Sequence, residues 1–372
     1  INGNSGITGT ISSANSLVGT KTNDLVGYYY SITILTNGNY VISSPYWDDG
    51  SITDVGAVTW GSGNAPLTGV INSANSLIGG TINDQIGSNT VKALSNGNYV
   101  VNSPYWKPYP PSYIYFGAVT WGNGATGTTG IVNNSNSLTG SQPNDVVGNG
   151  GVFPLSNGNY VVSSINWPAG AGKGAVTWCN GTTVTSDLVN VSNSLTGSTS
   201  SDWLGGGGNG GTVVPLTNGN YVVVSPWWDD GSIVNAGAVT WCTGTATTTA
   251  TVSSANSLIG STANDMVGSA NPGNNVVNTV ALTNGNYVVG SYYWDNGSVT
   301  DAGAVTWANG TAGITGTISV ANSLVGTTAN DKVGRIYPLT NGNFIINAIN
   351  WDNGSIANAG AITWVNGSTG TT

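Results

Sequence analysis

The chain has 372 residues, of which 57 are Gly, 6 are Lys or Arg and 15 are acidic, and its formal net charge is -9. It contains no His, every acidic residue is Asp, and Arg335 is the single arginine. This composition lacks the usual catalytic bases, the usual zinc ligands and the basic stripe that nucleic-acid binding requires. We therefore expect no cofactor, no bound metal and no nucleic-acid partner.

Low charge does not predict disorder in this chain. Hydrophobic residues make up 39% of it, including 14 Trp and 16 Tyr, which is enough to form a core. No apolar run reaches the roughly 18 residues of a membrane-spanning helix, so no membrane insertion is expected. A chain rich in Asn, Gly, Ser and Thr that starts at Ile1, without Met or a signal peptide, favours a mature or excised part of a bacterial protein that is secreted or held at the cell surface.

Internal repeats organise the whole chain. In each repeat N-S-L is followed by a turn containing Asp, then by L-[TS]-N-G-N-[YF] and then by G-A-[VI]-T-W, and this series occurs six times at about 62 residues per repeat. The turn aspartates are Asp24, Asp84, Asp145, Asp202, Asp265 and Asp331. The tryptophans that end G-A-[VI]-T-W are Trp60, Trp121, Trp178, Trp241, Trp307 and Trp364. Six repeats fill residues 1–372, which predicts a single domain without a linker.

Each repeat predicts four β-strands and no helix, because β-branched and aromatic runs alternate with Asn-Gly turns. In the second repeat we expect strands from Val91 to Leu94, Tyr99 to Trp106, Gly117 to Trp121 and Gly130 to Leu138. Four-stranded units at this period are typical of the blades of a β-propeller. The prediction is an all-β, six-bladed β-propeller, with a β-solenoid and an outer-membrane barrel as the alternatives.

The two ends of the chain suggest how such a ring closes. The chain begins within a repeat, at the fourth-strand sequence from Ile7 to Leu17, and it ends with the third-strand sequence G-A-I-T-W-V-N-G. We expect the N-terminal strand to complete the last blade, which contains Trp351 and Trp364, and so to remove an exposed sheet edge.

The repeated phrases resemble a known family. The run V-x-L-T-N-G-N-Y-V-V-S-S-P-Y-W, then A-G-A-V-T-W, then N-S-L-x-G before the Asp turn resembles the FG-GAP repeat of integrin-α-type propellers and repeats of bacterial haemagglutinin-like and adhesin-like surface proteins. The resemblance implies adhesion or glycan binding. Where the FG-GAP loop carries several Asp, this chain has T-N-G-N or S-N-G-N, as at Asn37 to Asn39, so calcium is not expected there.

Most of the repeated residues have a structural interpretation. The tryptophans of G-A-[VI]-T-W are expected to pack between blades, and the turn aspartates to cap turns. A second tryptophan per repeat follows the L-[TS]-N-G-N strand and either packs or borders a variable loop: Trp47, Trp106, Trp167, Trp228, Trp294 and Trp351. Cys179 and Cys242 occupy equivalent positions in consecutive repeats, so we expect two free, buried thiols.

The loop between the second and third strands differs among repeats, and variation on a repeated scaffold is typical of binding surfaces. Aromatic rings beside Asp suit sugars, because rings stack on C–H faces while carboxylates accept hydrogen bonds from hydroxyl groups. Ordinary Asp-Gly or Asn-Gly hairpin turns, or a cation site at the Asp pairs, would also fit these residues. The candidate ligand-binding residues are Tyr46, Trp47, Asp48, Tyr105, Trp106, Trp227, Asp229, Tyr293, Trp294 and Asp295.

Two functions remain open. The first is a non-enzymatic extracellular binding or adhesion module, possibly lectin-like, whose partner is a glycan or another cell-surface ligand. Catalysis is not expected, because the serines have no base within the repeated motif. The second is a structural repeat domain of a larger surface protein, or a self-associating extracellular filament, whose partners are neighbouring copies of itself.

Overall fold

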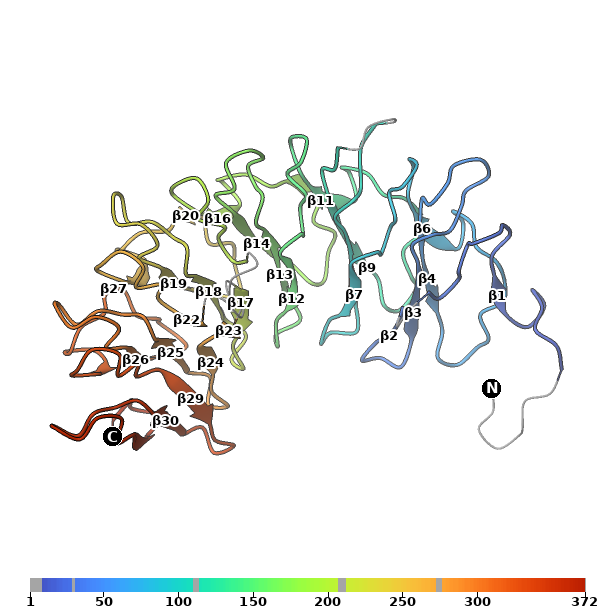
Figure 1. Ribbon diagram of the computed structural model, residues 1–372. Helices are drawn as coiled ribbons and strands as arrows, with labels where there is room; N and C mark the ends of the chain where they lie inside the picture. Colours follow the sequence, from blue (N-terminus) through green and yellow to red (C-terminus); the bar gives the residue numbers. More distant parts are fainter. Residues whose placement is uncertain (1–8, 29–30, 110–113, 207–211, 272–275, 372) are drawn as a thin grey trace. The chain divides into compact units, whose positions relative to one another are not determined.

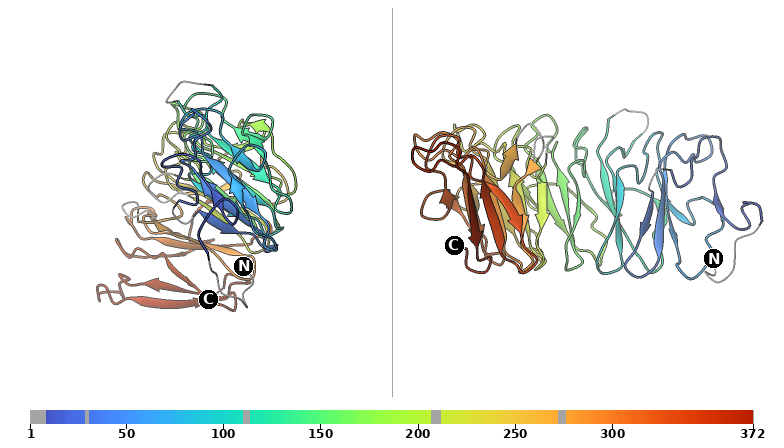
Figure 2. Two further views of the ribbon diagram at one scale, coloured as in Figure 1. Left: turned by 90° about the vertical axis from the view of Figure 1, so that its right-hand side faces the viewer. Right: turned by 60° about the horizontal axis from the view of Figure 1, so that its bottom comes forward.

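The computed structural model describes residues 9–28, 31–109, 114–206, 212–271 and 276–371. Every regular element in these ranges is a β-strand, and Figures 1 and 2 show the strands as successive small sheets. The predicted all-β repeat fold is confirmed. The described ranges contain no helix that is long and apolar enough to cross a membrane.

Each repeat contributes the same series of strands. The first strands are β2 (Ile32–Ile34), β7 (Thr90–Ala93), β12 (Gly151–Pro154), β17 (Thr212–Pro215), β24 (Thr279–Ala281) and β29 (Arg335–Pro338). The second strands are β3 (Tyr40–Ser44), β8 (Tyr99–Ser103), β13 (Tyr160–Ser164), β18 (Tyr221–Ser225), β25 (Tyr287–Ser291) and β30 (Phe344–Ala348). The third strands are β4 (Ala57–Gly61), β9 (Ala118–Gly122), β14 (Ala175–Cys179), β19 (Ala238–Cys242), β26 (Ala304–Ala308) and β31 (Ala361–Val365).

Shorter strands complete the series. The fourth strands, with sequence S-L-x or L-V, are β1 (Leu17–Val18), β6 (Ser76–Ile78), β11 (Ser137–Thr139), β16 (Ser194–Thr196), β21 (Ser257–Ile259) and β28 (Leu324–Val325). Two-residue strands precede most of them: β5 (Gly69–Val70), β10 (Gly130–Ile131), β15 (Asp187–Leu188), β20 (Ala250–Thr251) and β27 (Gly316–Thr317). A hairpin of β22 (Ser269–Asn271) and β23 (Val276–Val277) adds to the fifth repeat.

Each five-stranded sheet includes one short strand that comes from the next repeat along the chain. In the first complete sheet the order is β10-β6-β4-β3-β2, where β2, β3, β4 and β6 run antiparallel and β10 of the next repeat pairs in parallel with β6. The single fourth strand predicted from Gly130 to Leu138 is therefore wrong, because it consists of two strands in two sheets. The cause is a turn between them, in which the backbone N–H of Asn133 donates to Asn136 Oδ1 at 2.9 Å.

The chain divides into two compact units, residues 1–148 with 180–188 and residues 149–179 with 189–372, which are described separately. In each unit the core lies between consecutive sheets. One face of a second strand packs toward the following repeat and the other face toward the preceding one, so that Val41 and Val58 meet Tyr99 and Val101. A single propeller domain over residues 1–372 stays a prediction.

The predicted ring closure is not confirmed. The strand β1 pairs in parallel with β5, with Leu17 opposite Gly69, and the last sheet has the order β29-β30-β31 without a fourth strand in the described ranges. Residues 7 and 8 of the expected closing strand lie outside these ranges. The sequence prediction treated residues 7 to 17 as one strand, and so it missed that β1 has its own parallel partner in the following repeat.

The peptide that follows each third strand links consecutive repeats. The carbonyl oxygen of Gly124 accepts hydrogen bonds from Trp60 Nε1, Asn37 Nδ2 and Asn39 Nδ2 of the preceding repeat, each at 2.9 Å. A Cβ at Gly124 would overlap the carbonyl oxygen of Gly97, so only glycine permits this approach. We call this arrangement the carbonyl clamp; the equivalent acceptors are Gly181, Gly244, Gly310 and Gly367. The expected packing is thus confirmed for Trp60, Trp121, Trp178, Trp241 and Trp307, with a hydrogen bond added. The prediction is wrong for Trp364, which is 47% exposed on the last sheet.

Replacing Asn157 by Asp, an isosteric change, should destabilise the protein. The new carboxylate oxygen would face the carbonyl oxygen of Gly244, to which the side-chain amide now donates at 2.8 Å. We expect the free energy of unfolding to fall by about 2 kcal/mol, measured by urea denaturation with tryptophan fluorescence at low protein concentration.

Asn341→Asp is the matched control for this change. Within the described ranges no carbonyl of a following repeat faces Asn341, so its loss should stay below about 0.5 kcal/mol. Equal losses in the two variants would show that the carbonyl clamp does not stabilise the stacking of the repeats.

Candidate ligand-binding site

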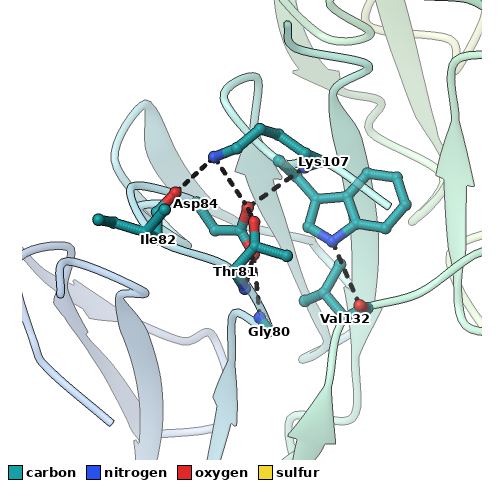
Figure 3. Close-up of polar contacts among 7 residues, drawn as sticks. Gly80, Thr81, Ile82, Asp84, Lys107 and Val132 are labelled. Carbon is teal, nitrogen blue, oxygen red and sulfur yellow. Dashed lines mark hydrogen bonds and ion pairs between the residues drawn. The ribbon is translucent and has the colours of Figure 1, made fainter. Parts of the chain in front are cut away.

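The turn aspartates fasten the candidate loops to the neighbouring turn. Asp84 Oδ2 accepts the backbone N–H groups of Gly80 and Thr81 at 2.9 and 2.7 Å, and Oδ1 accepts the backbone N–H of Lys107, in the loop of its own repeat, at 3.3 Å (Figure 3). The ammonium of Lys107 lies 3.4 Å from Oδ1 and also donates to the carbonyl of Ile82. Burial raises the pKa of the Asp84 carboxyl, and the hydrogen bonds from Thr81 and the charge of Lys107 oppose that rise.

The same attachment recurs along the chain, so the predicted capping role of these aspartates is confirmed. In each case Oδ1 accepts the backbone N–H of the residue that follows the second tryptophan. The donor and acceptor pairs are Asp48 with Asp24, Asp229 with Asp202, Asp295 with Asp265, and Asp352 with Asp331. In the third repeat the residue after Trp167 is Pro168, which has no N–H to donate.

The predicted ligand carboxylates shape their own loops. Oδ1 of Asp48 accepts the backbone N–H of Asp54 at 2.9 Å, and Oδ1 of Asp295 accepts that of Asp301 at 2.8 Å. Asp229 bonds to the backbone N–H of Asn235 at 2.7 Å in the same way. One oxygen of each predicted carboxylate is therefore already committed to the backbone, which makes these side chains positioning groups for the loop.

Three of the predicted ligand-stacking tryptophans lie in the core. Trp47, Trp106 and Trp294 are each 3% exposed, so their rings offer no face to a ligand in this structure. The indole N–H of Trp106 donates to the carbonyl of Val132 at 3.2 Å, which fixes the ring between repeats. Loop proximity in the sequence did not reveal this, because the turn that follows each second strand directs the tryptophan ring into a hydrophobic cluster.

The residue before each buried tryptophan is the exposed member of the pair. Tyr46, Tyr105, Trp227 and Tyr293 are all partly exposed or exposed. Each contacts a ring or a cation from another segment that the sequence analysis did not single out. These contacts are Tyr28 with Tyr46 at 5.1 Å, Tyr105 with Tyr115 at 5.2 Å, Trp203 with Trp227 at 6.4 Å, and Lys332 Nζ to the Tyr293 ring at 5.3 Å.

A positional signal could have found two of these partners. Trp203 and Lys332 directly follow a turn aspartate, and both have a left-handed backbone, with φ of 43° and 51°. This position is Leu25 in the first repeat, also with a positive φ of 43°, and Leu25 lines the groove beside Tyr46. The residue after the turn aspartate therefore varies in type while its backbone conformation is fixed, as expected at a recognition surface.

Two grooves flank the edge-to-face pair of Tyr28 and Tyr46 in the first unit. One, of about 350 Å³, is also lined by Leu25, Asp48 and Asp54. The other, of about 320 Å³, is lined by the same two rings and by the polar residues Ser31, Thr33, Ser43, Ser88, Asn89 and Thr90. Burial, followed by the charge of Asp48, raises the pKa of Asp54. The two rings thus separate an acidic groove from an uncharged polar one.

Other reactive groups are sparse in the described part of the chain. No cluster of three His, Cys, Asp or Glu side chains that could hold a metal ion occurs there. Cys179 and Cys242 are buried, and no disulfide joins them, as predicted. Burial raises the pKa of Cys242 to about 12, so this thiol stays protonated at neutral pH and is a poor nucleophile.

Comparison with known repeat families identifies the chain. It belongs to the family described as a repeat of unknown function (DUF5650), which matches residues 1–28, 34–88, 93–149, 154–206, 215–269, 281–335 and 338–372. These are seven segments, of which the first and last are shorter than the other five. The FG-GAP resemblance is not confirmed. None of the curated proteins compared with the chain matches it.

Among solved structures, the chain is similar to that of a streptogramin B lyase. The two have 9% sequence identity and a TM-score of 0.37, and the match covers 91% of this chain and 83% of the other. The expectation that the chain has no enzyme activity needs correction on this point, because the similar structure belongs to a protein named as a lyase. The likeness is too distant to transfer an activity or a residue role.

Replacing Asp84 by Asn should destabilise the protein through the loop attachment. The amide nitrogen of Asn would meet backbone N–H donors, and the buried ammonium of Lys107 would lose its carboxylate. We expect a loss of about 3 kcal/mol in the free energy of unfolding, measured by chemical denaturation.

Asp49→Asn is the control, because Asp49 is exposed in the equivalent loop of the first repeat and should lose less than about 0.5 kcal/mol. If Asp84→Asn is as stable as this control, the turn aspartates are not what holds the loops in place.

Proposed function

We propose that this DUF5650 repeat chain is a binding protein that takes an extended, largely uncharged ligand, of which a polysaccharide is the best match, on the rings of its second-to-third-strand loops. The observation that carries the proposal is the pair of grooves around Tyr28 and Tyr46. It combines exposed aromatic rings with hydroxyl and amide groups that hydrogen-bond to sugars. A secreted or cell-surface location and an adhesive role belong to the same proposal.

The chemistry of the grooves favours a neutral sugar over a charged ligand. The groove of about 320 Å³ is lined by Ser, Thr, Asn, Gly, Pro, Val and Tyr, and none of these side chains is charged at neutral pH. The edge-to-face contact holds the two tyrosine rings against each other, so that little side-chain entropy is lost when a ligand binds. In the other groove Asp48 and Asp54 would repel an anionic ligand.

Repetition supplies further shallow platforms of the same kind. Tyr105 with Tyr115 and Trp227 with Trp203 place partly exposed rings at the equivalent positions of the second and fourth repeats. Each ring stacked on a sugar contributes on the order of 1 kcal/mol beyond buried area. Weak sites on one chain reach a useful affinity when a polymer occupies several of them together.

The set of proposed contact residues is therefore smaller than the set that the sequence analysis expected. Tyr46, Tyr105, Trp227 and Tyr293 are proposed as contact residues, with Tyr28 and Trp203 added. The carboxylates of Asp48, Asp229 and Asp295 position the loops through Oδ1. The Oδ2 atoms of Asp48 and Asp229 are proposed to accept hydrogen bonds from sugar hydroxyl groups, whereas Oδ2 of Asp295 accepts the hydroxyl of Thr262 at 3.3 Å.

The Tyr28 and Tyr46 rings can be tested directly. A polysaccharide identified on a glycan array should bind Tyr46→Ala and Tyr28→Ala about fivefold more weakly than the parent chain, because each variant loses one stacking face. Isothermal titration or affinity electrophoresis measures the change, and circular dichroism verifies the fold.

Two variants serve as controls for this test. Tyr46→Phe keeps the ring and should retain most of the binding, whereas Tyr337→Ala removes an exposed tyrosine on β29 that lines neither groove and should leave binding unchanged. Unchanged binding in both groove variants, or the absence of any glycan ligand, would contradict the proposal.

A further inference from the structure

The two ends of the repeat array expose apolar surfaces that interior repeats bury. Ile362 on the last sheet is 67% exposed, whereas its counterpart Val305 is 3% exposed. Ile32 on the first sheet is 60% exposed, whereas its counterpart Val91 is 9% exposed. Stacked repeat arrays normally require terminal repeats with a polar outer face. These two faces instead keep the apolar side chains of interior repeats.

A groove at the last repeat has the shape of a vacant interior position. It measures about 430 Å³ and is lined by Val305, Leu324, Phe344, Ile346 and Val365, among others. One repeat earlier, the five equivalent residues surround a buried isoleucine; they are Val239, Leu258, Tyr287, Val289 and Ala308.

The isoleucine that fills the earlier position is Ile318, which is 2% exposed within the cluster formed by Val239, Leu258, Tyr287 and their neighbours. The residue at the same place in the sequence pattern G-T-I-S-x-A-N-S-L near the start of the chain is Ile11. Ile11 is 86% exposed. The last repeat therefore has a groove that an isoleucine side chain would fill, and Ile11 is an isoleucine that no groove buries.

The sheet edges match in the same way. β26 pairs antiparallel with β28, with Val305 opposite Leu324, and the hydroxyl groups of Thr306 and Ser323 lie 2.6 Å apart. β31 has no such fourth strand in the described ranges, and its sequence A-I-T-W-V carries no charge or proline to protect the edge. The segment S-L-V at residues 16–18 has the sequence that this edge pairs with in other repeats.

The hydrogen-bonding groups of the carbonyl clamp are also complementary between the two ends. Trp364, Asn341 and Asn343 are the donor residues of the last repeat, and within the described ranges no glycine carbonyl of a following repeat faces them. The equivalent acceptor at the start is Gly63, whose N–H donates to Asn39 Oδ1 at 3.0 Å, as Gly124 does to Asn98.

We propose that two copies of this chain associate head to tail, with residues 9–18 of one copy inserted into the last repeat of the other. Ile11 fills the groove, Ser16 to Val18 pair with β31, and the donors of Trp364, Asn341 and Asn343 bind the carbonyl oxygen of Gly63. The second copy is the occupant because this interface continues, residue for residue, the one that already joins consecutive repeats. On the accepting face, Arg335 is in register with Ile362, and its Nε donates a hydrogen bond to the hydroxyl of Tyr292.

The test uses the 372-residue chain and two variants that each block one end. In Ile11→Asp the inserted segment carries a charge, and in Ile362→Asp the accepting face does; both residues are exposed, so the fold is preserved. Val234→Asp, at an exposed loop position, is the control. Sedimentation velocity over a hundredfold range of concentration measures the mass of each protein and of an equimolar mixture of the two blocked variants.

We expect the parent chain and the control to grow beyond one-chain mass with concentration, and each blocked variant to stay monomeric. The mixture should form a complex of two copies and no larger species, because one free end of each kind remains. A parent chain that stays monomeric throughout overturns the proposal. If, in that case, the melting temperature of Ile11→Asp is lower than that of the parent chain, the groove of the last repeat is filled by the first repeat of the same chain. A mixture that fails to pair while the parent associates also overturns the head-to-tail arrangement.

Discussion

The carbonyl clamp is the interaction on which the stacking of repeats depends. Three donors from one repeat, an indole N–H and two side-chain amides, meet a single glycine carbonyl of the next, for example Trp60, Asn37 and Asn39 on Gly124. A neutral donor set of this kind satisfies the peptide without burying an ion, which would carry a large desolvation cost. This explains how the chain stacks its repeats with only 6% charged residues, because Asn amides and backbone groups make the contacts that ion pairs make elsewhere.

A second attachment acts at the other end of the long hairpins. The turn aspartate accepts two N–H groups of its own turn through Oδ2 and one N–H of the loop of its own repeat through Oδ1, as Asp265 does with Ser261, Thr262 and Asp295. The backbone of the same turn also bonds to the loop of the preceding repeat, since the N–H of Met266 donates to the carbonyl of Asn235. Each loop is therefore held on both sides by groups that do not depend on its variable side chains.

The sequence predicted the parts of the structure that follow from strand periodicity and turn chemistry. Strands at Tyr99–Ser103 and Ala118–Gly122, the capping aspartates and the buried cysteines that no disulfide joins all follow from residue type and spacing. The fourth strand was mispredicted because side chains of Asn133 and Asn136 turn the chain between β10 and β11, and Asn in a polar repeat gave no warning of this.

Site prediction failed where two adjacent aromatic residues compete for one buried position. The Y-W pairs at residues 46–47 and 105–106 lie in turns just after β3 and β8, where the N–H of each Trp donates to the carbonyl of Ser44 or Ser103, so strand periodicity does not say which ring is buried. Tertiary packing decides it: Trp106 is buried against the preceding sheet and Trp47 against Val55, Ala57 and Ile78, while Tyr46 and Tyr105 stay partly exposed. Ring closure stays a prediction, since it depends on how far successive sheets turn, which no local sequence pattern records.

The way the loops are held explains how a repeat can vary its surface without losing its place in the array. The turn aspartate binds the backbone of the residue after the buried tryptophan, so the side chain there is free to differ. It is Asp48, Asp229, Asp295 and Asp352 in four repeats but Lys107 in another, and in every one the same N–H reaches the same carboxylate oxygen. Pro168 is the exception: proline has no backbone N–H, so this hydrogen bond to the turn aspartate cannot form in the third repeat. Attachment through the backbone thus separates the residues that stack the repeats from those that face solvent, and a repeated scaffold of this kind can present a different ring or charge in each copy.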